Sequence, residues 1–158
     1  MTRKLLIAAS LCVAVLMTYQ VNNAADTTKV NLKGVNCFLK TTKDGKPIAV
    51  KAALSVAYKG AKVYFCCGGC KGKFAKDAKC RAANAHKANH QLAATGQAKL
   101  TKCVFSGKAL NTDTKIKVNG VTICFCCNMC KGKVLKAKDK VALAFNDKAF
   151  AKGYVVAK

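Results

Sequence analysis

A cluster of cysteines that occurs twice, sixty residues apart, constrains this sequence most strongly. The first copy reads Phe-Cys-Cys-Gly-Gly-Cys-Lys-Gly-Lys over residues 65–73, and the second reads Phe-Cys-Cys-Asn-Met-Cys-Lys-Gly-Lys over residues 125–133. A single cysteine precedes each cluster, Cys37 the first and Cys103 the second. Thiols repeated at a fixed spacing indicate a repeated device that joins distant parts of the chain through sulfur.

The residues on either side of each cluster predict that it lies between a β-hairpin and a helix. In the second copy, alternating apolar residues surround Asn119-Gly120, which is the strongest short hairpin signal. The first copy has a turn signal at Lys59-Gly60, at the equivalent position. Runs rich in alanine and lysine follow, and they predict one helix from the first cluster to about Ala94 and another from the second to about Phe145.

Other segments give weaker patterns. Val30 and Leu32 predict a short strand that ends near Cys37, and the polar residues 41–47 predict a loop. Residues 48–58 fit a strand or a helix equally well. A last short helix is expected from Asn146 toward Gly153, followed by a closing strand over residues 154–156.

The first 25 residues are typical of an export signal. Arg3 and Lys4 precede an apolar run from Leu5 to Met17, and small residues precede Asp26. The run is shorter than the roughly 20 apolar residues that span a membrane. We therefore expect residues 1–25 to be a cleaved signal, with a periplasmic or secreted mature chain and no stable membrane span.

Charge and composition exclude several classes of function. The chain has 29 Lys and Arg against six acidic residues, for a net charge of +23, and removing the signal leaves +21. The acids are all Asp and are scattered, so paired-carboxylate catalysis has little support, and we expect a binding protein and not an enzyme. Arg3 and Arg81 are the only arginines, which favours diffuse attraction to polyanions, such as envelope polymers, over specific reading of nucleic acid.

The two copies are small for independent folding. Units of about 60 residues bury too little surface to be stable without additional cross-links. Eleven cysteines could supply them, and tight Cys-Cys-x-x-Cys clusters suit a metal knuckle better than a disulfide framework.

The second copy resembles the small YHS and TRASH-type cysteine modules, which are similar to treble-clef zinc fingers. The resemblance is carried by Cys103-Val-Phe-Ser-Gly-Lys, the hairpin, and Phe-Cys-Cys-x-x-Cys-Lys; the first copy matches at Tyr58-Lys-Gly, Phe65-Cys66 and Cys70. It implies an α+β fold of two tandem hairpin–helix modules joined by a helical bridge, over residues 26–96 and 97–158. It also implies a role in binding, sensing or trafficking heavy metals. A metal-handling protein is therefore one expected partner.

The predicted metal ligands are the upstream cysteine and the sulfurs of each cluster. One ion is expected in each copy, with Zn²⁺ as the first choice and Cu⁺ or another soft ion as the alternative. Structural zinc needs four ligands, so the second cysteine of each cluster fills the last place or the site stays three-coordinate. The full set is Cys37, Cys66, Cys67, Cys70, Cys103, Cys126, Cys127 and Cys130.

Three alternatives remain open from the sequence. The chain could be a basic envelope protein held by disulfides, a thiol redox protein that uses Cys67-Gly-Gly-Cys70, or a finger protein that binds polyanions or nucleic acid. His86 and His90 share a helix face and could bind a metal or simply pack, and the same choice applies to Met129. Cys80 and Cys124 have no counterpart in the other copy, so they lie outside the repeated device.

Overall fold

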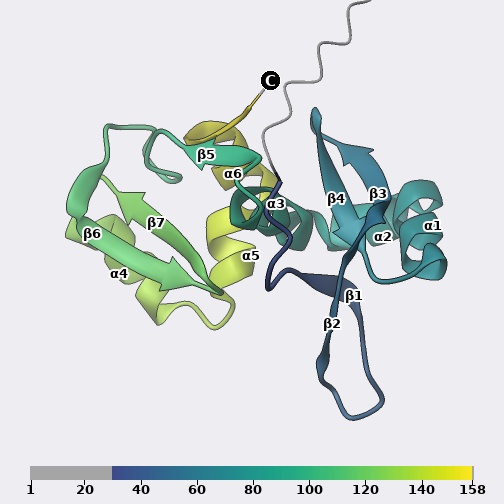
Figure 1. Cartoon of the computed structure of the whole chain (residues 1–158). Coiled ribbons are helices and arrows are strands. Elements are labelled where there is room, and N and C mark those ends of the chain that lie inside the picture. The colour runs from purple at the N-terminus through teal and green to yellow at the C-terminus, as the bar shows by residue number, and fades with distance from the viewer. Residues whose placement is uncertain (1–29, 158) are drawn as a thin grey trace, which may run out of the picture.

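The computed structural model describes residues 30–157 (Figure 1), so the predicted export signal lies outside the described residues. The elements follow in the order β1 (Asn36–Thr41), β2 (Pro47–Ala49), β3 (Lys51–Tyr58), β4 (Ala61–Phe65), α1 (Gly68–Lys76), α2 (Ala78–Ala83), α3 (Ala85–Ala94), β5 (Ala98–Leu100), β6 (Asn111–Val118), β7 (Val121–Phe125), α4 (Asn128–Lys136), α5 (Lys140–Phe145), α6 (Asp147–Gly153) and β8 (Tyr154–Val156). The fold is mixed α+β, with small antiparallel hairpins and short helices.

The sequence repeat is also a structural repeat. Strands β3 and β4 and helix α1 have the same lengths as β6, β7 and α4, and each begins sixty residues earlier. We call residues 51–76 the first hairpin–helix unit and residues 111–136 the second. Both hairpins are antiparallel, and both have an irregular register in the first strand, between Lys51 and Ser55 and between Asn111 and Ile116.

The two hairpin turns confirm the turn signals. Lys59 and Gly60 have φ values of 50° and 80°, and Asn119 and Gly120 have values of 44° and 85°. Two successive residues with positive φ form the tight turn whose twist matches that of the flanking strands. Asparagine and glycine enter this conformation at low cost, whereas a lysine in the same place is less favourable.

The helical segments are shorter than predicted, and the single helix expected after Cys70 was wrong. Three helices, α1, α2 and α3, occupy that run. The chain is extended at Asp77, whose carboxylate accepts the N–H of Cys80 at 2.9 Å and so begins a new helix. Asp139 does the same in the second copy by accepting the N–H of Ala142 at 2.8 Å, so α4 and α5 are also separate.

The segment around Cys37 also differs from the prediction. The strand begins at Asn36 and contains Cys37, whereas a strand ending near Cys37 was expected. Gly34, with φ of 76°, turns the chain just before it. Residues 42–46, within the predicted loop 41–47, join β1 to β2, and residues 48–58 are extended and not helical.

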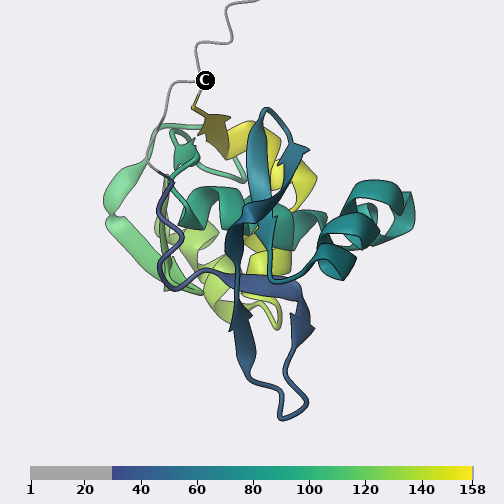
Figure 2. The ribbon, with the colours of Figure 1, turned by 45° about the vertical axis from the view of Figure 1, so that its right-hand side comes forward.

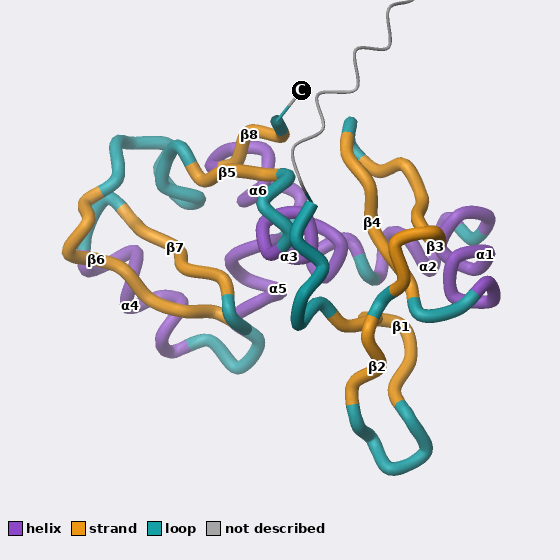
Figure 3. The backbone as a smooth tube through the Cα atoms, in the orientation of Figure 1, coloured by secondary structure: helices purple, strands orange, loops and turns teal. Residues whose placement is uncertain are grey.

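Helices α3, α5 and α6 lie between the two hairpins (Figures 1 and 3). Helix α3 packs against both α5 and α6, and the side chains of Leu92 and Phe145 are fully buried there. Buried residues of both hairpin–helix units belong to one continuous apolar cluster with these helices. Lys59, in the first hairpin turn, also forms an ion pair with Asp147 at the start of α6.

Two glutamine side chains protect the outer edge of β4. Gln91 accepts the N–H of Tyr64 at 2.7 Å and donates to its carbonyl at 3.1 Å. Gln97 makes the same pair of bonds with Lys62, at 2.9 and 2.8 Å. The side-chain amides therefore replace a third strand, and they close an edge that would otherwise be open to pairing.

The remaining strands complete the body of the protein. Strand β5 pairs with β8, so the predicted short C-terminal helix and closing strand are both present. The predicted division near residue 96 falls in the turn between α3 and β5, where Gly96 has φ of 76°. The β1–β2 hairpin projects from the body of the molecule, as both views show (Figures 1 and 2). Within residues 30–157, no helix has the length and apolar character that crossing a membrane requires.

Candidate metal centres

The first cluster brings together sulfurs from three elements. Cys37 lies on β1, Cys66 directly follows β4, and Cys70 lies in the first turn of α1. All three are buried, and their Sγ atoms lie within 4.8 Å of one another. The Sγ atoms of Cys66 and Cys70 are 3.9 Å apart.

The second cluster repeats this arrangement with Cys103, Cys126 and Cys130. Their Sγ atoms also lie within 4.8 Å of one another, and those of Cys126 and Cys130 are 3.8 Å apart. Cys103 begins a tight turn in which its carbonyl accepts the N–H of Gly107 at 2.8 Å. We call the two sets of three cysteines the first and second triads.

The triads have the dimensions of a thiolate metal site. An ion about 2.3 Å from each sulfur separates two sulfurs of a tetrahedron by about 3.8 Å. The measured separations of 3.8 and 3.9 Å match this value, whereas a disulfide needs about 2.05 Å. A disulfide within a triad would also leave its third thiol without a partner.

Cys67 and Cys127 stand beside the triads and not within them. Each is the residue before a helix, Cys67 before α1 and Cys127 before α4. Cys67 is half-buried and Cys127 is exposed. The Sγ of Cys127 lies 3.7 Å from that of Cys126, a direct sulfur contact with the second triad.

An apolar core holds each triad in place. Phe65 and Phe74 are fully buried in the first unit, and Phe125 and Val134 are fully buried at the same positions of the second. Phe38, the neighbour of Cys37, packs edge-on against Phe65 at 5.4 Å between ring centroids. The residues that flank the cysteines are thus fixed by packing, which aligns the sulfurs before any ion binds.

The upstream cysteine of each triad favours the thiolate. Burial raises the pKa of Cys37, but the backbone N–H groups of Cys66 and Leu39 outweigh it and the pKa is lowered. Burial also opposes ionisation of Cys103, yet the hydroxyl and N–H of Ser106 and further backbone N–H groups lower its pKa to about 6. Hydrogen bonds to the charged form explain both shifts.

The helical cysteine of each triad favours the thiol. Burial is the main cause that raises the pKa of Cys70 and raises that of Cys130 to about 12, and neighbouring sulfurs add to it. Within each triad, the pKa shifts of the upstream and helical cysteines therefore have opposite directions. Binding of a cation would release thiol protons, so affinity is expected to rise with pH.

The second cysteine of each cluster is also activated. The backbone N–H of Cys70 is the largest cause that lowers the pKa of Cys67 to about 7, and the N–H of Cys130 lowers the pKa of Cys127. Neither side chain makes a capping hydrogen bond of good geometry, so these N–H groups act through their electrostatic field at the helix start. Each of these sulfurs lies next to a triad, and Cys127 is more exposed than Cys67.

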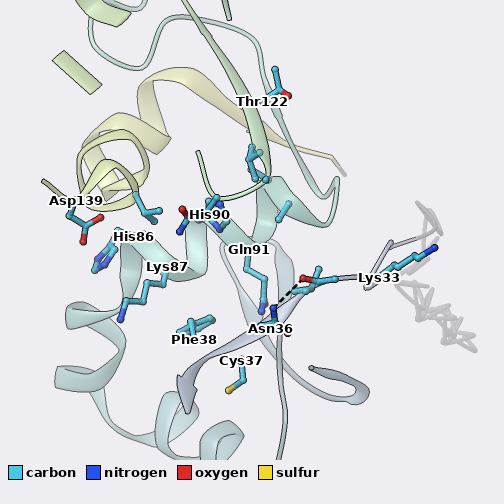
Figure 4. Close-up of a pocket in the computed structure, with 18 residues that line it drawn as sticks. Lys33, Asn36, Cys37, Phe38, His86, Lys87, His90, Gln91, Thr122 and Asp139 are labelled. Carbon is cyan, nitrogen blue, oxygen red and sulfur yellow. Dashed lines mark hydrogen bonds between the residues drawn. The ribbon is translucent and has the colours of Figure 1, made fainter. Parts of the chain in front are cut away.

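The two histidines lie on α3 in a cleft beside the second hairpin turn, and they do not join a triad. The cleft has a volume of about 690 Å³ and is lined by α3, the segment before β1, the second hairpin turn and the start of α5 (Figure 4). His90 Nε2 lies 3.1 Å from the carbonyl oxygen of Val118, and its ring packs edge-on against Phe145. Burial lowers the pKa of His90. His90 therefore packs α3 against the second hairpin and α5, while His86 lines the cleft.

The other residues singled out in the sequence fall outside the triads. Cys80 is buried on α2 and Cys124 is half-buried on β7, as the absence of a repeated counterpart indicated. Met129 is 75% exposed. Ser106 was missed, although it donates its hydroxyl to Cys126 Sγ at 3.2 Å; its place three residues after Cys103 was the only available signal.

Comparison of the chain with protein-family models, with curated proteins and with solved structures finds no significant match.

Proposed function

We propose that the protein binds two thiophilic metal ions, one in each triad, as a tandem pair of modules of the YHS/TRASH, treble-clef-like type. The observation that carries the proposal is the convergence of three cysteines in each half from a separate upstream segment, a strand end and a helix start. The upstream residue in each case arrives from a distance of more than twenty residues, which packing alone does not require.

The choice of ion follows from the ligand set. Three thiolates and a nearby fourth sulfur suit Zn²⁺, which takes four ligands, and three thiolates alone suit Cu⁺. We propose Zn²⁺ as the ion when Cys67 or Cys127 completes the site, and Cu⁺ or a similar soft ion when it does not. The role is then stabilisation of the fold in the first case, and sequestration or trafficking in the second.

The cellular setting is part of the same proposal. Residues 1–25 would direct export, and the mature chain would act without catalysis in the periplasm or outside the cell. Its lysine-rich helices would favour anionic envelope polymers, or a metal-handling protein with an acidic surface.

The test is the ion content of the mature chain, purified without chelator and measured by elemental analysis with native mass spectrometry. Two ions per chain are expected. Replacing Cys103 and Cys130 with Ser should leave one ion and lower the melting temperature, because bound metal contributes to folding free energy.

Cys124→Ser is the matched control, because it removes a thiol that lies outside both triads. It should retain both ions. If the Cys103/Cys130 variant keeps its ion content and melting temperature, the proposal is wrong.

Thiol oxidoreduction is the second candidate, and the lowered pKa of Cys67 beside Cys70 favours it. The protein would then reduce insulin disulfides in the presence of dithiothreitol, and Cys67→Ser would abolish this activity. Activity that survives in Cys67→Ser would argue against a redox role for this pair.

A further inference from the structure

The two triads differ in how well the fold covers them. All three cysteines of the first triad are buried, whereas Cys126 of the second is half-buried. The same contrast extends to the next residue, because Cys67 is half-buried and Cys127 is exposed. Equivalent positions of a repeated unit therefore have different access to solvent.

An insertion in the first copy explains the difference. Thirteen residues separate Cys37 from β3, and seven separate Cys103 from β6, so the first copy has six additional residues in this segment. The longer segment forms the β1–β2 hairpin, and β1 packs against β4, the strand that leads to Cys66. Cys103 is instead followed by a tight turn, which adds no second strand over its triad.

The second triad also has two accessible sulfurs beside it. The Sγ of Cys127 lies 3.7 Å from that of Cys126. Met129, which precedes Cys130, has a side chain that is 75% exposed, and the first copy has Gly69 at this position. Met129 thus places an exposed thioether one residue before the triad ligand Cys130, and thiolate with thioether is a ligand pair that selects Cu⁺.

We propose that the second triad exchanges a soft ion of the Cu⁺ class with the surroundings, with Cys127 and Met129 as its entry ligands, while the first triad retains its ion. This inference rests on the proposed function. Cys127 and Met129 can hold an incoming or departing ion while the triad sulfurs are exchanged one at a time. The ion then keeps at least one sulfur ligand throughout the exchange. The covered first triad offers no such route, because Cys67 beside it is half-buried and Gly69 has no side chain.

Exchange can be followed by transfer of Cu⁺ from the fully loaded chain to the chromogenic chelator bicinchoninate. The expected time course has two phases of equal amplitude, one ion leaving quickly and one slowly. Cys127→Ser and Met129→Gly should each slow the fast phase by about 10- to 100-fold, the range found when groups next to metal ligands are removed. Both residues are exposed, so both variants should fold; Met129→Gly should lose some stability, because glycine is the poorer helix former in α4.

A parallel measurement with Zn²⁺ separates the two entry ligands. Met129→Gly should slow Cu⁺ release and leave Zn²⁺ release unchanged, because zinc sites use Cys, His and carboxylate ligands, whereas Cys127→Ser should slow both. Gly69→Met is the matched control in the first copy, since it adds a thioether where the neighbouring thiol is half-buried. It should leave the rate of the slow phase within about twofold of its value in the unsubstituted chain, well below the 10- to 100-fold effect expected at the second triad.

Ion content before transfer distinguishes this inference from the function on which it rests. A chain that binds no ion contradicts both. A chain that binds two ions and releases them in a single phase, or keeps its fast phase in both variants, overturns the exchange role and leaves the metal-binding proposal intact.

Discussion

Gly153 provides a sharp test of how the second triad is positioned. It ends α6 and lies against the segment that leads to Cys103. Its carbonyl accepts the N–H groups of Thr101 at 2.8 Å and Lys102 at 3.1 Å. A Cβ atom at this position would lie 2.8 Å from the carbonyl oxygen of Lys102, 2.8 Å from Val104 Cγ1 and 3.1 Å from Val104 Cα.

The Gly153→Ala substitution therefore forces the backbone on both sides of Cys103 to move. Overpacking of a tight interior typically costs about 1–3 kcal/mol, and we expect about 2–3 kcal/mol because part of the clash is with backbone. For a chain of this size, the melting temperature should fall by on the order of 10 °C. Displacement of Cys103 should also weaken ion binding at the second triad and leave the first triad unchanged.

Gly132→Ala is the matched control, because Gly132 lies within α4 and a Cβ there meets no atom within 4 Å. Alanine is the better helix former, so this variant should gain about 0.5–1 kcal/mol. Differential scanning calorimetry of the two variants, with ion content measured in parallel, decides the matter. If Gly153→Ala is as stable as the unsubstituted chain and holds two ions as tightly, the packing described here is wrong.

Three further changes test other parts of the fold. Gln91→Leu leaves the buried N–H and carbonyl of Tyr64 without their partner, and urea unfolding should show a loss of about 2–4 kcal/mol. Thr114→Val removes the hydroxyl that accepts the N–H of Phe125 at 2.8 Å, and should cost about 1–3 kcal/mol in the same assay. Burial opposes ionisation of Asp147, but hydrogen bonds from lysine and asparagine side chains lower its pKa. Its contribution is therefore present above the unfolded-state pKa of about 3.9 and is lost as the pH falls through the lower folded-state value. Because Asp147 is largely exposed, Asp147→Asn should cost about 0.5 kcal/mol near neutral pH, and the difference should shrink below about pH 4.

Each of these predictions has an outcome that contradicts it. Thr112→Val changes an exposed residue of the same strand and should alter stability by less than about 0.5 kcal/mol. If Thr114→Val causes no greater loss than Thr112→Val, the Thr114 hydroxyl does not stabilise the fold. A Gln91→Leu variant of unchanged stability would mean that the β4 edge needs no side-chain partner. A constant stability difference for Asp147→Asn across the acid range would rule out linkage through this carboxylate.

Local sequence determined the repeated hairpin–helix unit. The Asn119-Gly120 turn, the alternation in residues 121–125 and the position of Cys130 at a helix start depend on residues a few positions apart. Such features follow from backbone conformation and from strand and helix periodicity, so a single sequence is enough to predict them. The helix breaks at Asp77 and Asp139 were also available as capping signals, but the alanine-rich flanks obscured them.

Only the tertiary structure decided which distant residues meet. Gln91 and Gln97 hold β4 through bonds that cross about thirty residues of chain, and nothing in their local sequence distinguishes them from exposed polar residues. The same applies to the unequal cover of the two triads, which results from the β1–β2 hairpin and the packing of β1 on β4. The sequence by itself determined that sulfur recurs at a fixed spacing, because spacing is a local property. Which sulfurs come together, and how far water reaches them, depends on long-range packing that local pattern does not encode.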